Sequence, residues 1–285
     1  MIFDSHAHLN FKAFSEDIAE VISRCQKKKM LVLNVGSQLV TSQRAVEIAR
    51  NNSNFFASVG IHPIHIWGEN LDEHEQAAKK EMGKMEPEEM FNEIAKLAKD
   101  SKVVAIGETG IDYFHIEKEL ETVKKLQKKF FKMHLALAEE LNKPLVLHAR
   151  ASASEDAYWD ILEILKEKEY LPLSEKKGVI HCFGSNLEIA NEFISLGFAI
   201  GFTGIITFKK KAENLQMVAK NIPLENILIE TDSPYLAPEP YRGKRNEPIY
   251  VEEVAKKISE LKGVPIGQVI EGTTNNAKEI FKIII

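Results

Sequence analysis

The chain alternates short apolar runs with longer, charged segments of helical periodicity. Apolar strands separated by helices predict a parallel sheet that is covered on both faces. Eight such units in 285 residues predict an α/β fold, a closed (β/α)8 barrel of the TIM type. The expected strands are residues 2–6, 30–35, 55–60, 103–107, 145–148, 179–182, 198–201 and 228–231. The expected helices are residues 15–28, 37–51, 69–99, 118–142, 154–168, 186–196, 209–221, 251–261 and 266–281.

An open, doubly wound sheet is the alternative arrangement of the same elements. Its dinucleotide-binding form is disfavoured because no Gly-x-Gly-x-x-Gly follows the first apolar run. No Pro-, Gly- or Ser-rich linker divides the chain, so residues 1–285 are expected to form a single domain. The acidic, lysine-rich stretch at residues 70–93 is expected to be a helical insertion between the third and fourth strands, with its charges in water.

Charge and cysteine content limit the partners and the compartment. The formal net charge of -5 argues against a broad nucleic-acid-binding surface but allows a local one. The two cysteines, Cys25 and Cys182, lie far apart without motif spacing, which argues against a disulfide framework and fits a reducing compartment. No apolar run reaches membrane-spanning length, and the N-terminus has no signal-peptide pattern. We therefore expect a cytoplasmic protein with no membrane contact and no obligate protein partner.

The first eight residues place metal-ligand side chains at alternate positions. If residues 2–8 form a strand, Asp4, His6 and His8 share one face, with both imidazoles at the C-terminal end. Two imidazoles suit a divalent cation such as Zn, Fe, Ni or Mn, but they leave it short of ligands unless other strands contribute. Taken alone, the pair is equally compatible with two surface histidines.

A barrel of this type carries its functional residues at the C-terminal ends of several strands. In this chain those ends have metal-ligand residue types almost throughout. They are His6, His8, His62, Glu108, His148 with Arg150, His181 and Asp232. The chain has only nine histidines, so this placement is not expected by chance. It predicts a metal centre at the mouth of the barrel.

The motifs at these ends are spread over essentially the whole chain. They are His6-x-His8, Gly-Ile-His-Pro at 60–63, Gly-Glu-Thr-Gly-Ile-Asp-Tyr at 107–113, His148-x-Arg150, His-Cys-Phe at 181–183 and Glu-Thr-Asp-Ser-Pro-Tyr-Leu at 230–236. Together they resemble the TatD family of metal-dependent deoxyribonucleases, within the amidohydrolase-like barrels. The resemblance implies a TIM-type barrel with divalent cations that hydrolyses phosphodiester bonds of DNA, typically as a 3′-to-5′ exonuclease acting on DNA ends or single strands.

The family pattern also implies a set of ligands. By that pattern His6, His8 and Asp232 hold a first cation, His148 and His181 hold a second, and Glu108 bridges the two. A carboxylate suits a bridge because each oxygen can bind one cation, and paired cations can clamp a phosphate and activate the attacking water. Asp232 can also accept the proton of that water as general base. Two divalent cations per chain are therefore expected, with Mg, Mn and Zn left open.

Two residues beside this set are candidates for binding the substrate. Arg150 follows His148 by two positions and so shares its face, where its planar fork could clamp a phosphate. The alternative is an arginine that bridges loops. His62 could hydrogen-bond a phosphate oxygen or merely order the loop before Pro63.

Other residues near the strand ends have supporting roles in this prediction. Glu230 shares a face with Asp232, and we expect it to orient a ligand histidine. Asp112 and Tyr113 either line the pocket or serve the structure of their loop. Cys182 alternates with His181, so we expect it to point outward into the helix layer.

Basic residues follow the last two strands. Lys209 to Lys211 come after the seventh, and Arg242, Lys244 and Arg245 come after the eighth. Both clusters should face the mouth of the barrel, where they could attract a polyanion to an otherwise acidic protein. For the lysines the alternative is an exposed helix start.

Two other functions use the same residues. The first is metal-dependent hydrolysis of an amide or an ester, for example an aminoacyl ester on tRNA. The second is a metal-binding scaffold without catalysis, which the complete ligand set disfavours. Release of nucleotides from DNA distinguishes the leading prediction from both.

Overall fold

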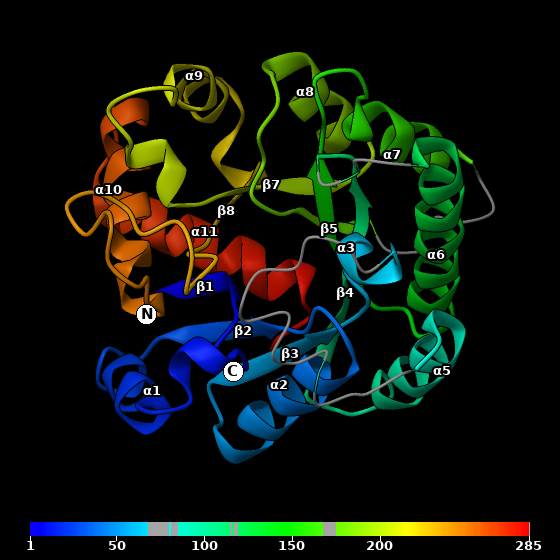
Figure 1. The fold of residues 1–285 in the computed structure, drawn as a ribbon. Coiled ribbons are helices and arrows are strands. Elements are labelled where there is room, and N and C mark those ends of the chain that lie inside the picture. The colour runs from blue at the N-terminus through cyan, green and yellow to red at the C-terminus, as the bar shows by residue number, and fades with distance from the viewer. Residues whose placement is uncertain (68–79, 81–84, 115, 117–118, 168–174, 285) are drawn as a thin grey trace.

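Eight parallel strands form one sheet in which the order of the strands follows the sequence. In this computed structural model, which describes residues 1–67, 80, 85–114, 116, 119–167 and 175–284, the strands lie in a central ring and the helices surround it (Figure 1). The strands are β1 (Phe3–Ala7), β2 (Leu31–Val35), β3 (Phe55–Val59), β4 (Val103–Asp112), β5 (Leu145–Arg150), β6 (Gly178–Ile180), β7 (Phe198–Phe202) and β8 (Ile227–Ile229). A parallel bridge between Ala7 and Ser233 links β1 to the segment after β8 and closes the ring. The predicted TIM-type barrel is therefore confirmed.

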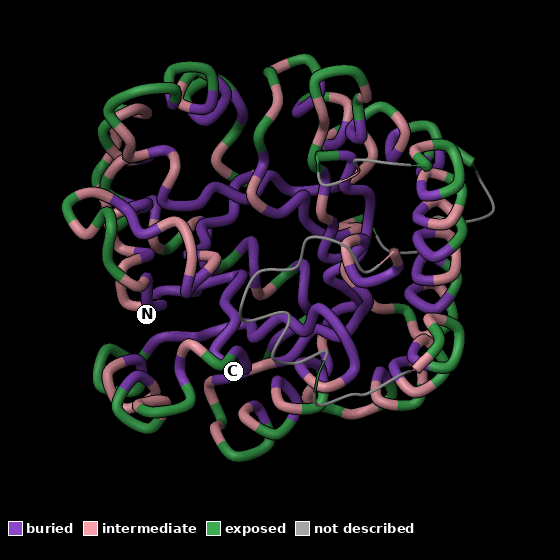
Figure 2. Tube along the Cα trace, viewed as in Figure 1, coloured by how far each residue is buried: buried purple, intermediate pink, exposed green. Residues whose placement is uncertain are grey.

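Helices alternate with the strands and cover the outside of the ring. They are α1 (Ile18–Lys27), α2 (Leu39–Asn51), α3 (Pro63–Trp67), α5 (Pro87–Leu97), α6 (Leu120–Glu140), α7 (Ala157–Lys166), α8 (Leu187–Ser195), α9 (Glu213–Asn221), α10 (Val251–Lys262) and α11 (Ile266–Ile280). Burial follows the strands and the inner faces of the helices, while the outer faces are exposed (Figure 2). Among the helices of the described residues, none combines the length and apolar composition needed to cross a bilayer.

A separate apolar cluster fills the interior of the barrel. Most strands contribute an inward side chain to it, including Phe3, Leu33, Ala105, Val146, Val179, Ala199 and Leu228. The end of α11 adds Ile280 and Phe281, whose ring lies 6.0 Å from that of Phe3. The apolar packing thus occupies one end of the barrel. Polar side chains are left to the C-terminal ends of the strands.

Strand β4 is longer than the sequence pattern predicts. The pattern predicts an end at Gly107, but the strand continues to Asp112 and pairs Gly110 with His148. Gly107 and Gly110 have φ angles of 140° and 143°, which residues with a side chain rarely adopt, so glycine at both positions allows the strand to continue. Glu108 therefore lies inside a strand rather than after one.

The expected insertion at residues 70–93 is only partly covered. Residues 68–79 and 81–84 lie outside the described residues, and helix α5 begins at Pro87, a residue that suits the first helical turn. The elements of the barrel extend from β1 to α11, close to both ends of the chain. A single domain over residues 1–285 stays a prediction.

Candidate metal centre

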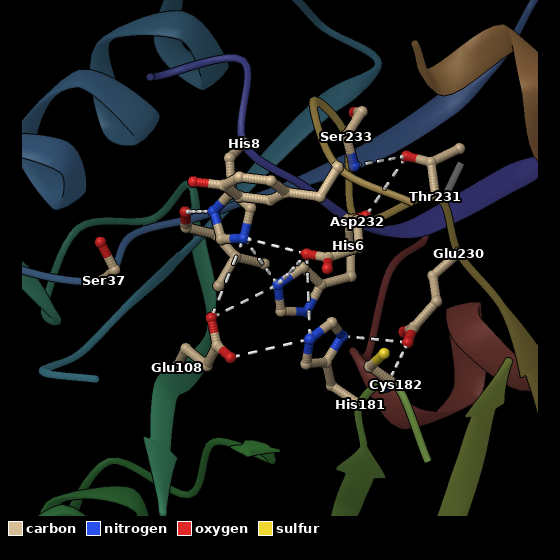
Figure 3. Close-up of polar contacts among 12 residues, drawn as sticks. His6, His8, Ser37, Glu108, His181, Cys182, Glu230, Thr231, Asp232 and Ser233 are labelled. Carbon is tan, nitrogen blue, oxygen red and sulfur yellow. Dashed lines mark hydrogen bonds and ion pairs between the residues drawn. The ribbon is translucent and has the colours of Figure 1, made fainter. Parts of the chain in front are cut away.

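The predicted metal ligands converge at the C-terminal ends of the strands. Figure 3 shows His6, His8, Glu108, His181 and Asp232 pointing toward one another from different segments. They come from the end of β1, the residue just after it, the middle of β4 and the segments after β6 and β8. All five are largely buried, although the side chain of Asp232 keeps 14% of its surface exposed. Side chains far apart in the sequence thus form one cluster.

A first donor group surrounds His6 in β1 and His8 just after that strand. The Nε2 atoms of His6 and His8 lie 3.1 Å apart. Oε2 of Glu108 lies 3.5 and 3.9 Å from them, and Oδ1 of Asp232 lies 3.8 and 3.3 Å from them. Metal bonds of 2.0–2.2 Å in a tetrahedron separate the ligand atoms by about 3.3–3.6 Å. The measured separations of 3.1–3.9 Å lie around that range, so the donor atoms of these four residues are spaced to bind one divalent cation.

The hydrogen bond of His8 to the backbone leaves the lone pair of its Nε2 atom directed toward this group. Its Nδ1 lies 2.8 Å from the carbonyl oxygen of Val35, which can only accept, so Nδ1 carries the proton and Nε2 is free to bind a metal. His6 stacks on His181 with ring centroids 3.5 Å apart. Burial, together with the charge on His181, lowers the pKa of His6. A neutral His6 is likewise suited to be a ligand.

Glu108 faces two groups of histidines at once. The first group contains His6 and His8, and the second group contains His148 and His181. Its Oε2 points to His6 and His8, whereas its Oε1 lies 3.0 Å from Nδ1 of His148 and 3.7 Å from Nε2 of His181. Burial alone would raise the pKa of Glu108, but nearby histidines, His62 and His181 foremost, outweigh it and hold the pKa well below its usual range. The carboxylate is therefore ionised, with one oxygen toward each group.

A carboxylate lies behind each histidine of the second group. Asp112 Oδ2 lies 2.9 Å from Nε2 of His148, and Glu230 Oε1 lies 3.0 Å from Nδ1 of His181. Each ring thus has one nitrogen toward Glu108 and the other on a carboxylate, the arrangement that orients metal-binding histidines in general. Burial would lower both pKa values, but the surrounding carboxylates raise that of His148 to about 9 and that of His181 to about 10.

The sequence left two roles open for Asp112, either to line the pocket or to serve the structure of its loop. The structure shows that its carboxylate contacts His148 and also accepts the backbone N–H of Phe114 at 2.9 Å. The signal that could have found it is the pairing of neighbouring strands, since Asp112 on β4 is in register with Arg150 on β5. Residues two positions apart on a strand share a face, so Asp112 lies within reach of His148.

Glu230 is held in place from several sides. Its Oε1 also accepts the backbone N–H of Cys182 at 2.5 Å, and Ser5 Oγ donates to its Oε2 at 3.4 Å. A Cβ atom at Gly201 would lie 2.7–2.8 Å from this carboxylate, so β7 approaches closely only because residue 201 has no side chain. The expectation that Glu230 orients a histidine agrees with this geometry.

Asp4 does not join the donor groups, although alternation places it on one face with His6. The register between β1 and β2 shifts between Asp4 and Ala7. The carboxylate of Asp4 instead accepts hydrogen bonds from the backbone N–H of Thr231 at 2.9 Å and from its hydroxyl at 2.6 Å. Asp4 thereby fixes β1 to the segment that carries Asp232.

The predicted orientation of Cys182 is wrong. Its backbone has φ of 45°, a left-handed conformation that breaks the alternation of the strand. Its sulfur lies within 4.8 Å of a ring nitrogen of His181 and of a carboxylate oxygen of Asp232, so the thiol faces the centre instead of the helix layer. No local sequence pattern signals this reversal.

His62 and Arg150 occupy different places. His62 Nε2 lies 3.5 Å from Oε1 of Glu108, at the edge of the second group. Arg150 does not reach either donor group: it is exposed, and its guanidinium lies over the ring of Phe114, 4.0 Å from the centroid. Arg150 therefore lies on the rim of the mouth.

The basic cluster after β8 divides into two kinds of residue. Arg245 donates to both oxygens of Asp17 at 2.7 and 2.6 Å and to Glu247 at 3.1 Å, so its charge is neutralised within the protein. The expectation that Arg245 serves an external polyanion is thus corrected. Arg242 is exposed and lies over the ring of Phe208.

Comparisons with known proteins place the chain in a family. The family model described as TatD related DNase matches residues 3–282. The uncharacterized metal-dependent hydrolase YabD of Bacillus subtilis is 38% identical over 284 residues, which cover 99% of this chain and 100% of that protein. The uncharacterized metal-dependent hydrolase YcfH of Escherichia coli K12 is 33% identical over 286 residues, covering 99% and 96%.

Solved structures agree on the fold. The crystal structure of YJJV, a TatD homolog from Escherichia coli K12, superposes with a TM-score of 0.82 at 23% identity, covering 99% of this chain and 98% of that one. A TatD family hydrolase from Entamoeba histolytica gives 0.77 at 22% identity, covering 98% and 97%. With the family model and the relatives above, these matches lead to one conclusion: the chain belongs to the TatD family and is a metal-dependent hydrolase.

Proposed function

We propose that this protein is a deoxyribonuclease that cleaves phosphodiester bonds at DNA ends or in single strands, in the 3′-to-5′ direction. The observation that carries the proposal is the orientation of Glu108, whose two oxygens face two separate groups of histidines. A bridging carboxylate between paired cations is the arrangement used for in-line displacement at phosphate. The family name supports the same substrate class.

We assign two divalent cations per chain to these groups. His6, His8 and Asp232 would hold the first, His148 and His181 the second, and Glu108 would bind both. When bound, divalent cations lower the pKa of water and offset the charge of a phosphodiester. Four imidazoles favour Mn or Zn, and the carboxylate oxygens suit Mg, so Mg, Mn and Zn are the candidate cations.

Asp232 is the residue we assign to proton transfer. Burial would raise its pKa, but His181 and His8 outweigh burial and keep the pKa below its usual value. The carboxylate is therefore ionised at neutral pH and ready to accept the proton of an attacking water. Its partial exposure, 14% of the side chain, lets substrate and water reach it.

The tautomer of His62 makes its Nε2 a hydrogen-bond donor rather than a metal ligand. Its Nδ1 accepts the backbone N–H of Ile64 at 3.2 Å, and burial together with the charge on His148 holds its pKa well below the usual value. A neutral ring whose Nδ1 accepts must carry its proton on Nε2. We therefore assign His62 Nε2–H to a phosphate oxygen of the substrate, and Arg150 on the rim to a neighbouring phosphate.

The test is release of mononucleotides from single-stranded DNA labelled at either end. The metal-loaded protein is expected to shorten the strand from its 3′ end, and Asp232→Asn is expected to abolish turnover while its circular dichroism spectrum stays that of the unaltered protein. Cleavage of aminoacyl-tRNA esters or amides without nucleotide release would instead establish the alternative hydrolase. Retained turnover in Asp232→Asn would refute the assigned general base.

A cytoplasmic location is part of the proposal. Cys25 and Cys182 are both free thiols, as is usual in a reducing compartment. Expression with a fluorescent tag at either terminus would test it, because an extracellular or organellar signal would contradict it.

A further inference from the structure

Helix α6 carries two polar side chains on a buried face that is otherwise apolar. The helix lies on the outside of the ring and packs against β4 (Figure 1). Gln127 and His134 are both buried, and the other buried residues of α6 are Val123, Phe130, Phe131, Leu135, Leu137 and Ala138. Seven residues are two turns of a helix, so Gln127 and His134 point to the same side. A buried polar group is costly without hydrogen bonds, so the partners of these two side chains indicate their role.

Both ring nitrogens of His134 bond to the backbone. Nδ1 lies 2.7 Å from the carbonyl oxygen of Phe130, one turn earlier in α6, and Nε2 lies 3.0 Å from the backbone nitrogen of Ile61. A carbonyl oxygen only accepts and an N–H only donates, so Nδ1 carries the proton and Nε2 accepts. Burial lowers the pKa of His134 to about 4, which keeps the ring neutral. The ring of Phe91 packs against it at 79°, with centroids 5.0 Å apart. The orientation of His134 is therefore fixed.

The bond from Ile61 to His134 lies next to His62. Strand β3 ends at Val59, so Ile61 lies beyond the hydrogen-bond ladder that joins β3 to β4. His62 donates its own backbone N–H to the carbonyl oxygen of Ser37 at 2.8 Å. The segment that carries His62 is thus held from two sides, by α6 through His134 and by the residues before α2 through Ser37.

Gln127 bonds to both backbone groups of Asp112. Its Oε1 accepts the N–H of Asp112 at 3.0 Å, and its Nε2 donates to the carbonyl oxygen of Asp112 at 2.9 Å. Strand β4 last pairs with β3 at Ile106, so its later residues extend past the end of β3. Toward β5, Tyr113 donates its N–H to the carbonyl oxygen of Arg150 at 2.8 Å. The amide of Gln127 offers one acceptor and one donor, as a peptide group does, and so takes the place of a neighbouring strand.

The two contacts of α6 converge on one oxygen of the metal centre. The carboxylate of Asp112 lies 2.9 Å from Nε2 of His148, so fixing the backbone of Asp112 fixes the group that orients this ring. Nδ1 of His148 and Nε2 of His62 both approach Oε1 of Glu108, at 3.0 and 3.5 Å. Side chains that only filled space could be apolar, like the rest of this face.

We propose that Gln127 and His134 are positioning residues through which α6 sets the geometry around Oε1 of Glu108. His134 places His62, and Gln127 places Asp112 and with it His148. The proposal rests on the proposed function for the roles of His62 and His148. Each positioning residue acts through the backbone of a different strand end, so their effects should be separable. General support of the fold by α6 would instead affect both strand ends together.

The experiment compares His134→Leu with Gln127→Met, which remove the hydrogen bonds and keep an apolar side chain of similar size. Histidine-ring nitrogen NMR shifts are recorded on the metal-free full-length protein, and Mn²⁺ binding is followed by calorimetric titration. His134→Leu should change the shifts of His62 more than those of His148 and leave both Mn²⁺ affinities unchanged. It should lower kcat/KM for single-stranded DNA about tenfold, the order expected for one lost hydrogen bond.

Gln127→Met should have the opposite pattern. The shifts of His148 should change more than those of His62, because Asp112 loses the bonds that hold its backbone. Affinity for the second Mn²⁺ should fall about tenfold, the lower end of the range for outer partners of metal-binding histidines, with the first unchanged. Gln127→Asn keeps the amide but shortens its reach, so it should give the same pattern and replaces Gln127→Met if that variant does not fold.

Two further variants separate positioning from folding. His134→Gln keeps an acceptor for the N–H of Ile61, so it should restore the shifts of His62 and the turnover. Phe131→Leu is the matched control, since Phe131 is buried on the same helix and its side chain has no hydrogen-bonding group. Its unfolding temperature should fall while the shifts of both histidines and both Mn²⁺ affinities stay unchanged.

Three outcomes overturn the inference. They are equal changes at His62 and His148 in both variants, no recovery in His134→Gln, or the same changes in Phe131→Leu. The shifts and the Mn²⁺ titration do not depend on the substrate. If DNA is not cleaved by the unaltered protein but these readouts divide as expected, the proposed function falls and the positioning roles stand. If DNA is cleaved and the readouts do not divide, the positioning roles fall.

Discussion

The two sides of the metal centre hold their histidines by different means. On the β1 side, the backbone carbonyl of Val35 orients His8, and His6 is a ring of lowered pKa stacked on His181. On the β5 and β6 side, the carboxylates of Asp112 and Glu230 orient His148 and His181. Burial lowers the pKa of His6 and favours its neutral form, whereas carboxylates outweigh burial at His148 and His181 and favour their protonated forms.

The difference predicts how the sides respond to metal. On the β1 side the lowered pKa of His6 favours the neutral ring, although Asp232 and Glu108 outweigh burial and raise the pKa of His8. On the other side both rings carry a second proton at neutral pH in the absence of metal, since their pKa values are about 9 and 10. A cation there competes with protons, so the second group should fill later and with more proton release than the first.

Glu108→Ala should erase the difference between the two sides, because the two oxygens of Glu108 face one side each. We expect a loss of turnover larger than the about 10- to 100-fold that follows removal of an outer partner. Elemental analysis should find less than one cation per chain. Glu108→Gln, which keeps the size of the side chain, serves as the control for folding. Substantial turnover in purified, metal-loaded Glu108→Ala would contradict the bridging role.

Lowering the pH should weaken the second group more than the first. Below about pH 9 His148 is protonated, and below about pH 10 His181 is too, so a cation must displace both protons at neutral pH. Affinity should then fall by roughly tenfold per pH unit for each proton released, and recover as the pH rises. Calorimetric titration in buffers of different ionisation enthalpy counts these protons. A second binding step that releases none would contradict the pKa values.

Asp112→Asn should make the second side resemble the first. A neutral amide can still accept from His148, but it no longer favours the imidazolium, so the pKa of His148 should fall toward its usual value. The weaker proton competition would favour the cation, but His148 also becomes a less basic and less firmly oriented ligand. We expect the second effect to outweigh the first, so that affinity for the second cation drops about 10- to 100-fold, as for other outer partners of metal-binding histidines. The nitrogen NMR shifts of His148 report the change in protonation. Asp100→Asn, at a carboxylate paired with Arg50 before β4, is the matched control.

The sequence predicts which side chains gather at the mouth better than it predicts which groups support them. Parallel strands bring their C-terminal ends together whatever their side chains, so the strand pattern alone predicts His6, Glu108, His181 and Asp232 at one mouth. The contact between Asp112 and His148 depends instead on the extension of β4 past Gly107 and on its register with β5. The reversal of Cys182 depends on one backbone angle. Neither follows from residue types or their spacing.

Gly201→Ala should produce the smallest change and affect only the second side. The new Cβ would lie 2.7–2.8 Å from the carboxylate of Glu230, which is buried and already bonded to His181 and Cys182, so the carboxylate must move. Because the added methyl meets a side chain rather than the backbone, we expect the fold to adjust and the unfolding temperature to change little. The affinity of the second cation should fall by less than in Asp112→Asn, with the first unchanged. An equal loss at both sites would mean that Glu230 supports the whole centre rather than His181 alone.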